Sequence, residues 1–189
     1  MANNYSMGGR PRRDNRPDAE EKQFDERVVN VNRVARVVKG GRRFRFQALV
    51  VIGDHKGKAG AGVGKGADVS AAINKATDVA KKNLIQFPMH NGTLTHEVLG
   101  KVGGSRILIM PAAPGTGLIA GGVVRTVLEV AGFEDALSKS IGSSNKLNTA
   151  YATLEALKGM EPASKWVTRT SGGVKEAVAT PKKAAVKVE

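Results

Sequence analysis

The sequence predicts an α+β protein made of two small domains, and three observations support this fold class. Val-rich and alternating segments over residues 27–64 are followed by one amphipathic helical pattern, which gives a β-β-β-α order. A second set of short strands and two helices follows over residues 94–158, in the order β-β-α-β-α. Basic residues are concentrated in the first of these units, so charge separates the two as well.

The three predicted strands of the first unit differ in pattern. Residues 27–38 are rich in Val, which favours a strand, and the following residues 39–41 are a turn signal. Residues 42–53 alternate, with Arg43 and Arg45 on one face and apolar residues on the other. Residues 58–64 form a third strand that is short and rich in glycine. These segments predict an antiparallel sheet.

A helix is predicted over residues 68–87, where apolar residues recur at steps of three and four. Asp68 lies at its start, where a carboxylate suits both the cap position and the helix dipole. The helix needs an apolar sheet face to cover, so we expect Phe44 and Phe46 to be core residues. The alternative is that the two rings stack on RNA bases.

The second unit contains five predicted elements, and its composition is close to neutral. Residues 113–117 form a Pro- and Gly-containing loop that leads into the first of two helices. The elements are strands over residues 94–99, 105–112 and 133–142, and helices over residues 119–131 and 145–158.

Polar, low-hydrophobicity segments flank these two units. Residues 1–23 are predicted to be a disordered extension, and residues 163–189 a basic tail. The predicted domains are therefore residues 24–92 and residues 93–162. The 18 uncharged residues 107–124 contain two Pro and four Gly, which argues against a membrane helix, and we expect no membrane partner.

The formal net charge of +13 makes an anionic polymer the first partner to consider. Residues 27–92 hold 13 Lys and Arg against three Asp, a net charge of +10. Residues 93–163 hold six basic and six acidic residues, a net charge of zero. The chain has no Cys, which excludes disulfides and zinc–thiolate sites.

The stretch "KAGAGVGKGADVSAA", residues 58–72, resembles a phosphate-binding loop in composition. The P-loop spacing fails, because Ala59 and Gly66 stand where that motif needs Gly and a hydroxyl. The dinucleotide pattern matches from Gly62 to Ala67, but no second strand with a terminal acid follows at the required distance. We expect no nucleotide cofactor and no small-molecule substrate.

The same stretch fits contact with an RNA backbone better. Glycine lets phosphate approach the main chain, a helix start offers free N–H groups, and Lys65 adds a positive charge. Neighbouring basic residues are expected to share this surface, which would build affinity for phosphate. The predicted RNA-binding residues are Arg33, Arg36, Lys39, Arg42, Arg43, Arg45, Lys56, Lys58, Gly62, Gly64 and Lys65.

Catalytic and metal-binding patterns are weak. The loop Pro114–Leu118 is faintly similar to an ATP-phosphate loop of small-molecule kinases, but the Ser residues that follow in those enzymes are absent. His55, His90 and His96 lack metal-ligand spacing. We therefore expect a protein that is not an enzyme and has no metal or cofactor.

Three long segments resemble bacterial small-subunit ribosomal protein five, from about residue 24 to residue 157. They are "VNRVARVVKGGRRFRFQALVVIGD", "GKAGAGVGKGADVSAAINKATDVAKKNL" and "NGTLTHEVLGKVGGSRILIMPAAPGTGLIAGGVVRTVLEVAGFEDALSKSIGSSNKLNTAYATLEAL". The resemblance implies that the first unit is similar to a double-stranded-RNA-binding domain without its first helix. It implies a left-handed βαβ crossover in the second unit.

The resemblance also implies a function. The family is a structural constituent of the small ribosomal subunit in the cytoplasm, binds 16S rRNA where head and body meet, and influences translational accuracy. It contacts ribosomal proteins four and eight and lies near the channel through which mRNA enters. Lys39, Gly40 and Gly41 match an antibiotic-proximal loop, and Gly117 and Arg125 match a protein interface. Composition alone leaves two alternatives, a free double-stranded-RNA-binding regulator and a phosphate-transferring enzyme.

Overall fold

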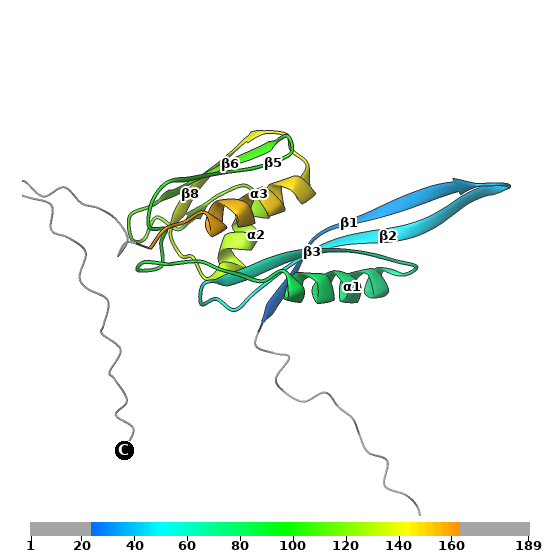
Figure 1. The fold of residues 1–189 in the computed structure, drawn as a ribbon, viewed down its shortest axis with the longest axis horizontal. Helices are drawn as coiled ribbons and strands as arrows, with labels where there is room; N and C mark the ends of the chain where they lie inside the picture. The colour runs from blue at the N-terminus through cyan, green and yellow to red at the C-terminus, as the bar shows by residue number, and fades with distance from the viewer. Residues whose placement is uncertain (1–23, 163–189) are drawn as a thin grey trace, which may run out of the picture.

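The computed structural model describes residues 24–162, which form two four-stranded sheets and three helices (Figure 1). The disorder and the basic tail expected for the ends of the chain lie outside these residues. The elements of the first unit are β1 (Asp25–Val38), β2 (Gly41–Gly53), β3 (Lys58–Gly66), α1 (Val69–Lys82) and β4 (Ile85–Gln86). Those of the second are β5 (Val98–Val102), β6 (Ser105–Pro111), β7 (Leu118–Ile119), α2 (Gly122–Ala131), β8 (Ala136–Gly142) and α3 (Lys146–Lys158).

The first sheet has the order β1-β2-β3-β4 and is antiparallel throughout. Alternate residues of β2, including Ala48, Val50 and Ile52, face α1 and are fully buried with Ala72, Ala76 and Ala80 of the helix. This packing follows from the period-two pattern of the strand and the three- and four-residue steps of the helix. The predicted β-β-β-α order is confirmed, with β4 as an added short strand.

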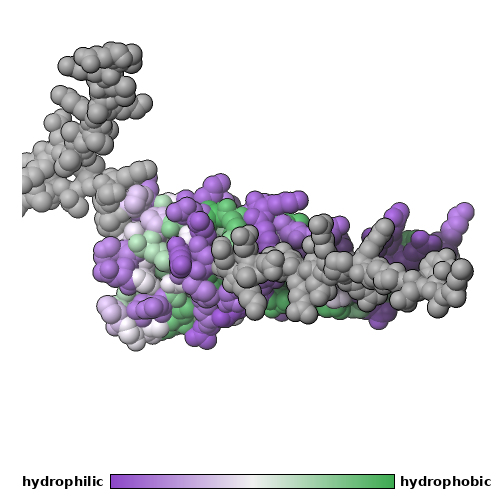
Figure 2. All heavy atoms as spheres, turned by 90° about the horizontal axis from the view of Figure 1, so that it is seen from below, coloured by the Kyte–Doolittle hydropathy of each residue, from purple (hydrophilic) through white to green (hydrophobic). Residues whose placement is uncertain are grey.

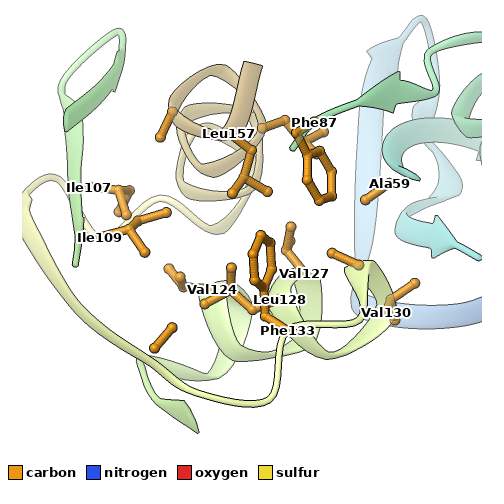
Figure 3. Packing of buried hydrophobic residues seen from close by; sticks show 14 of the residues in the cluster. Ala59, Phe87, Ile107, Ile109, Val124, Val127, Leu128, Val130, Phe133 and Leu157 are labelled. Carbon is orange, nitrogen blue, oxygen red and sulfur yellow. The ribbon is translucent and has the colours of Figure 1, made fainter. Parts of the chain in front are cut away.

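The second sheet has the order β5-β6-β8-β7. Helix α2 joins the parallel strands β7 and β8, which is the βαβ crossover that the resemblance implies. Helices α2 and α3 bury Val127, Leu128 and Leu157 against Ile107 and Ile109 of β6 (Figure 3). Only one face of this sheet is therefore covered by the helices.

One buried cluster joins the two units. Val51, Ala59 and Ala61 lie on the face of the first sheet that points away from α1, and they pack with α2 and α3. Phe87, which follows β4, stacks on Phe133 with ring centroids 5.5 Å apart (Figure 3). The cluster contains residues from both sides of the predicted domain boundary between residues 92 and 93, so the two units share a hydrophobic core.

Several sequence-based boundaries differ from the structure. Helix α1 ends at Lys82 rather than at Phe87, because the chain turns at Asn83 to pair β4 with β3. Asp68 is the N-cap residue of α1, but its side chain makes no capping hydrogen bond. Helix α2 begins at Gly122 rather than at Ile119, since Ile119 belongs to β7.

The prediction that Phe44 is a core residue is wrong, whereas Phe46 is partly buried against the cluster under α1. Strand β3 ends at Gly66, which pairs with Phe46 of β2. Residues 41–45 of β2 therefore extend beyond β3 and α1 by roughly 17 Å at the usual rise of a strand. No helix lies under this part of the ribbon, so Phe44 stays 48% exposed.

Candidate nucleic-acid interface

The outer part of the β1–β2 hairpin, residues 33–45, projects from the body of the molecule as a two-stranded ribbon (Figure 1). We call this segment the arm. It contains six Lys and Arg residues and no Asp or Glu. In Figure 2 the projecting end carries hydrophilic side chains that stand out from the surface. A ribbon of this kind has two faces, and the sequence alternation gives each face a different character.

One face of the arm carries a basic groove of about 500 Å³. Arg36 pairs with Arg43 across the two strands, and Arg45 follows on the same face. Lys65 of β3 completes the set, because its partner in β2 is Gln47, two residues after Arg45. These four exposed side chains, together with Val34, Ala35 and Val38, line the groove.

The cations of the basic groove are not neutralised by any acid of the described residues. Among residues 24–162, no Asp or Glu forms an ion pair with Arg36, Arg43, Arg45 or Lys65. Like charges placed directly opposite each other on paired strands, as Arg36 and Arg43 are, destabilise a sheet. A phosphate in the groove would relieve this repulsion, which suits the groove to a polyanion.

The other face of the arm is apolar and aromatic, with cations at its edge. The guanidinium carbon of Arg33 lies 3.7 Å from the centroid of the Phe44 ring. Contacts of this type contribute about 0.5–1 kcal/mol at exposed sites. Arg42 is on the same face and pairs with Val37, which is 75% exposed.

The tip of the arm is a two-residue turn between Val38 and Gly41. Gly40 has a φ of +80°, a conformation that glycine adopts far more easily than other residues. Lys39 is exposed, and a Cβ built on Gly40 or Gly41 would meet nothing within 4 Å. The predicted loop at residues 39–41 is therefore fully open to a partner.

Lys56 and Lys58 do not share the arm's surface, contrary to the sequence-based expectation. Lys56 lies in the β2–β3 turn and Lys58 is the first residue of β3, at the opposite end of β2 from the arm. The segment from Arg43 to Gly53 spans roughly 33 Å. The backbone N–H groups of both residues donate to Asp54 Oδ1, at 2.8 and 2.9 Å. The basic residues therefore form two separate groups.

Gly62 and Gly64 are buried, so their predicted contact with phosphate is wrong. A Cβ at Gly62 would lie 2.1 Å from the carbonyl oxygen of Ala76, and one at Gly64 would lie 2.3 Å from that of Ala72. These glycines allow α1 to pack closely on β3. Lys65 points to the opposite face, which places it in the groove rather than at the start of α1.

The predicted protein interface lies on the second unit. The N–H groups of Gly115 and Gly117 donate to the two oxygens of the buried Asp135 carboxylate, at 3.2 and 2.7 Å. Arg125 Nη2 donates to the carbonyl oxygen of Leu118 at 2.7 Å and remains exposed. Ile119, between them, is 55% exposed. Asp135 thus holds a rigid loop whose outer surface is free within the described chain.

Sequence analysis missed a polar contact between the two units. Arg27 of β1 pairs with Glu129 of α2 and also with Asp25, at 3.1 Å. His55 Nδ1 donates to the carbonyl oxygen of Glu129 at 2.8 Å, and its Nε2 lies 3.3 Å from Asp25. Arg27 and Glu129 are 102 positions apart in the sequence, so spacing along the chain gave no signal of this contact.

A second hollow, of about 440 Å³, lies between α3 and the β3–β4 region. Its lining is mostly apolar, with Leu84, Val102 and Leu154 among the residues, and it contains no Lys or Arg. Burial raises the pKa of Tyr151, which lines this hollow, above its ordinary value of 10.0. The hollow lacks the positive charge that an RNA backbone requires.

No helix in residues 24–162 combines the length and the apolar character needed to cross a bilayer. Over the same residues, no group of three His, Asp or Glu is arranged to hold a metal ion.

Comparison with known proteins assigns both units to related families. Residues 24–88 match the family described as Ribosomal protein S5, N-terminal domain, and residues 100–169 match Ribosomal protein S5, C-terminal domain. The chain is also similar to the small ribosomal subunit protein uS5 of Treponema denticola. The two are 54% identical over 136 residues, which cover 72% of this chain and 79% of that protein.

Proposed function

The chain belongs to the ribosomal protein S5 family, and on that premise we propose that it binds 16S rRNA mainly through the arm. Members of this family are structural, non-enzymatic components of the small ribosomal subunit. The protein accordingly acts in the ribosome, in the cytoplasm, with rRNA and other ribosomal proteins as partners.

The basic groove is the observation that carries the proposal. Four exposed cations converge on one face, none is paired with an acid in residues 24–162, and two of them repel each other across the strands. Backbone contacts of this kind supply affinity and orientation without reading sequence. The sheet and α1 position the groove, whereas the chemistry of binding belongs to the arm.

Lys56 and Lys58 form a second, smaller contact with rRNA in this proposal. Their distance from the groove suits a different segment of the RNA. Asp54 fixes the backbone of the turn, so the two Lys side chains project from a rigid support. Both contacts belong to the first unit and lie near opposite ends of β2, so the strand keeps their separation constant.

The remaining assignments follow the family. We place the protein at the junction of head and body, near the channel through which mRNA enters, where it influences translational accuracy. Gly117 and Arg125 face ribosomal protein four, and ribosomal protein eight is a further neighbour. The exposed Ile119 and the loop held by Asp135 support a protein contact here. The open turn at Lys39, Gly40 and Gly41 is the antibiotic-proximal loop.

Salt-dependent RNA binding tests the groove directly. The variant R43Q/R45Q/K65Q removes three positive charges from the groove, and K101Q/K139Q/K158Q removes three exposed charges from the second unit. The slope of log affinity against log salt should fall by about one for each phosphate that the protein no longer neutralises, in the groove variant only. Equal slopes for both variants and the unmodified protein would exclude the groove as the RNA site.

A further inference from the structure

The position of Phe44 is not explained by folding. The ring lies on the α1 side of the ribbon, yet β3 ends at Gly66 opposite Phe46, and α1, which begins at Val69, does not cover it. It is 48% exposed, and Val37 beside it is 75% exposed. Phe46, two residues further along β2, shows the contrast, because it is partly buried against the cluster under α1. An aromatic ring is thus held in solvent at the outer end of the sheet.

Arg33 and Phe44 together form a flat surface. The guanidinium carbon lies 3.7 Å from the ring centroid, so one planar group is placed over the other. No acid of residues 24–162 forms an ion pair with Arg33, so its positive charge is not compensated within this part of the chain. Nucleobases stack on both aromatic rings and guanidinium planes.

The positive charge around this surface favours RNA over a protein as its binding partner. The arm has six cations and no acid, and Arg42 lies on the same face as Phe44. An apolar protein surface would have to bury these cations without partners, which is costly. An RNA strand brings both a base for the flat surface and phosphates for the neighbouring cations.

We propose that the Arg33–Phe44 pair is a stacking platform for an unpaired RNA base. This inference rests on the proposed RNA-binding function of the arm and adds a second mode of contact to it. The basic groove on one face of the ribbon holds the phosphate backbone, and the platform on the opposite face takes a base that is not in a duplex. The arm therefore favours RNA in which a helix adjoins an unpaired nucleotide.

The test uses the full chain and two RNA hairpins of about 16 base pairs, the span of a typical duplex-binding domain. One hairpin is fully paired, and the other carries a single bulged 2-aminopurine, whose fluorescence falls when it stacks. F44L removes the aromatic ring and keeps an apolar side chain, and F44W keeps a stacking surface. Thermal melts of each variant check that the fold is retained.

We expect F44L to bind the bulged hairpin about tenfold more weakly and to lose the fluorescence decrease. Binding of the paired hairpin and the slope of log affinity against log salt should stay unchanged. F44W should retain both the affinity for the bulged hairpin and the fluorescence decrease. The platform is excluded if F44L weakens both hairpins equally or neither. It is also excluded if F44L leaves RNA binding intact but impairs association with a ribosomal protein. Failure of the groove would appear separately, as paired-hairpin binding that R43Q/R45Q/K65Q does not change.

Discussion

The inner and outer halves of β2 belong to one strand but have opposite roles. Residues 46–53 lie between two cores, with Val50 facing α1 and Val51 facing α2 and α3. Residues 41–45 have solvent on both faces and carry three Arg residues. The inner half stabilises the fold, and the outer half presents charge that the fold alone does not need. The strand thus connects the core directly to the proposed RNA-binding surface.

The largest effect is expected from the shared core. Leu128 of α2 is fully buried, so L128A should lower the free energy of unfolding by about 3–5 kcal/mol. Because the two units share this cluster, denaturant unfolding monitored by circular dichroism should stay a single transition. Separate transitions for the two units would contradict the shared core.

A smaller loss of stability is expected from a substitution at the contact between α1 and β3. G62A would place a methyl group 2.1 Å from the carbonyl oxygen of Ala76, and the resulting shift should cost about 2–3 kcal/mol. G122A is the matched control, because a Cβ there meets nothing within 4 Å. Thermal melts should separate the two variants, and equal stability would show that the helix is not tightly packed on the strand.

In the outer half, stability and binding should change in opposite directions. R43Q removes the repulsion with Arg36, so it should raise the free energy of unfolding by about 0.2–0.5 kcal/mol. The same substitution should weaken RNA binding and reduce the salt slope by about one. Chemical denaturation and filter binding measure the two quantities. A loss of stability in R43Q would mean that the groove supports the fold.

The smallest effect is expected at the polar contact between the units. E129Q weakens the ion pair between Glu129 and Arg27. Because these side chains are 36% and 42% exposed, the free energy of unfolding should fall by at most about 0.5 kcal/mol. E155Q is a suitable control, since Glu155 is exposed and forms no ion pair in the described chain. The difference between the two variants should diminish in high salt.

Periodicity predicted most of the fold but not which faces are covered. The alternation in β2 placed Phe44 and Phe46 on one face correctly, but it could not show that β3 extends only as far as Phe46 and leaves Phe44 uncovered. Two-residue strands such as β4 and β7 are too short to have a period. The order of the longer helices and strands along the chain was therefore predictable, but how far each one extends over its neighbours was not.

The site shows the same limit. Charge density predicted a basic surface in this segment, and Arg36, Arg43, Arg45 and Lys65 do come together in one groove. Gly62 and Gly64 were misassigned because glycine suits close approach by a helix as well as by phosphate. Lys56 was grouped with the arm because it is close to Arg45 in the sequence. The extended strand β2 nevertheless places the two residues at opposite ends of the sheet. Register decides which charges meet, and it becomes known only when the strands are paired.

Hydrogen exchange of the full chain, with and without bound rRNA, tests the division of β2 most directly. Amides of residues 33–45 should exchange quickly in the free protein and become protected on binding. Amides of residues 46–53 should exchange slowly in both states, because the core already protects them. Protection confined to the β2–β3 turn or to the second unit, with residues 33–45 unchanged, would contradict the assignment of RNA binding to the arm.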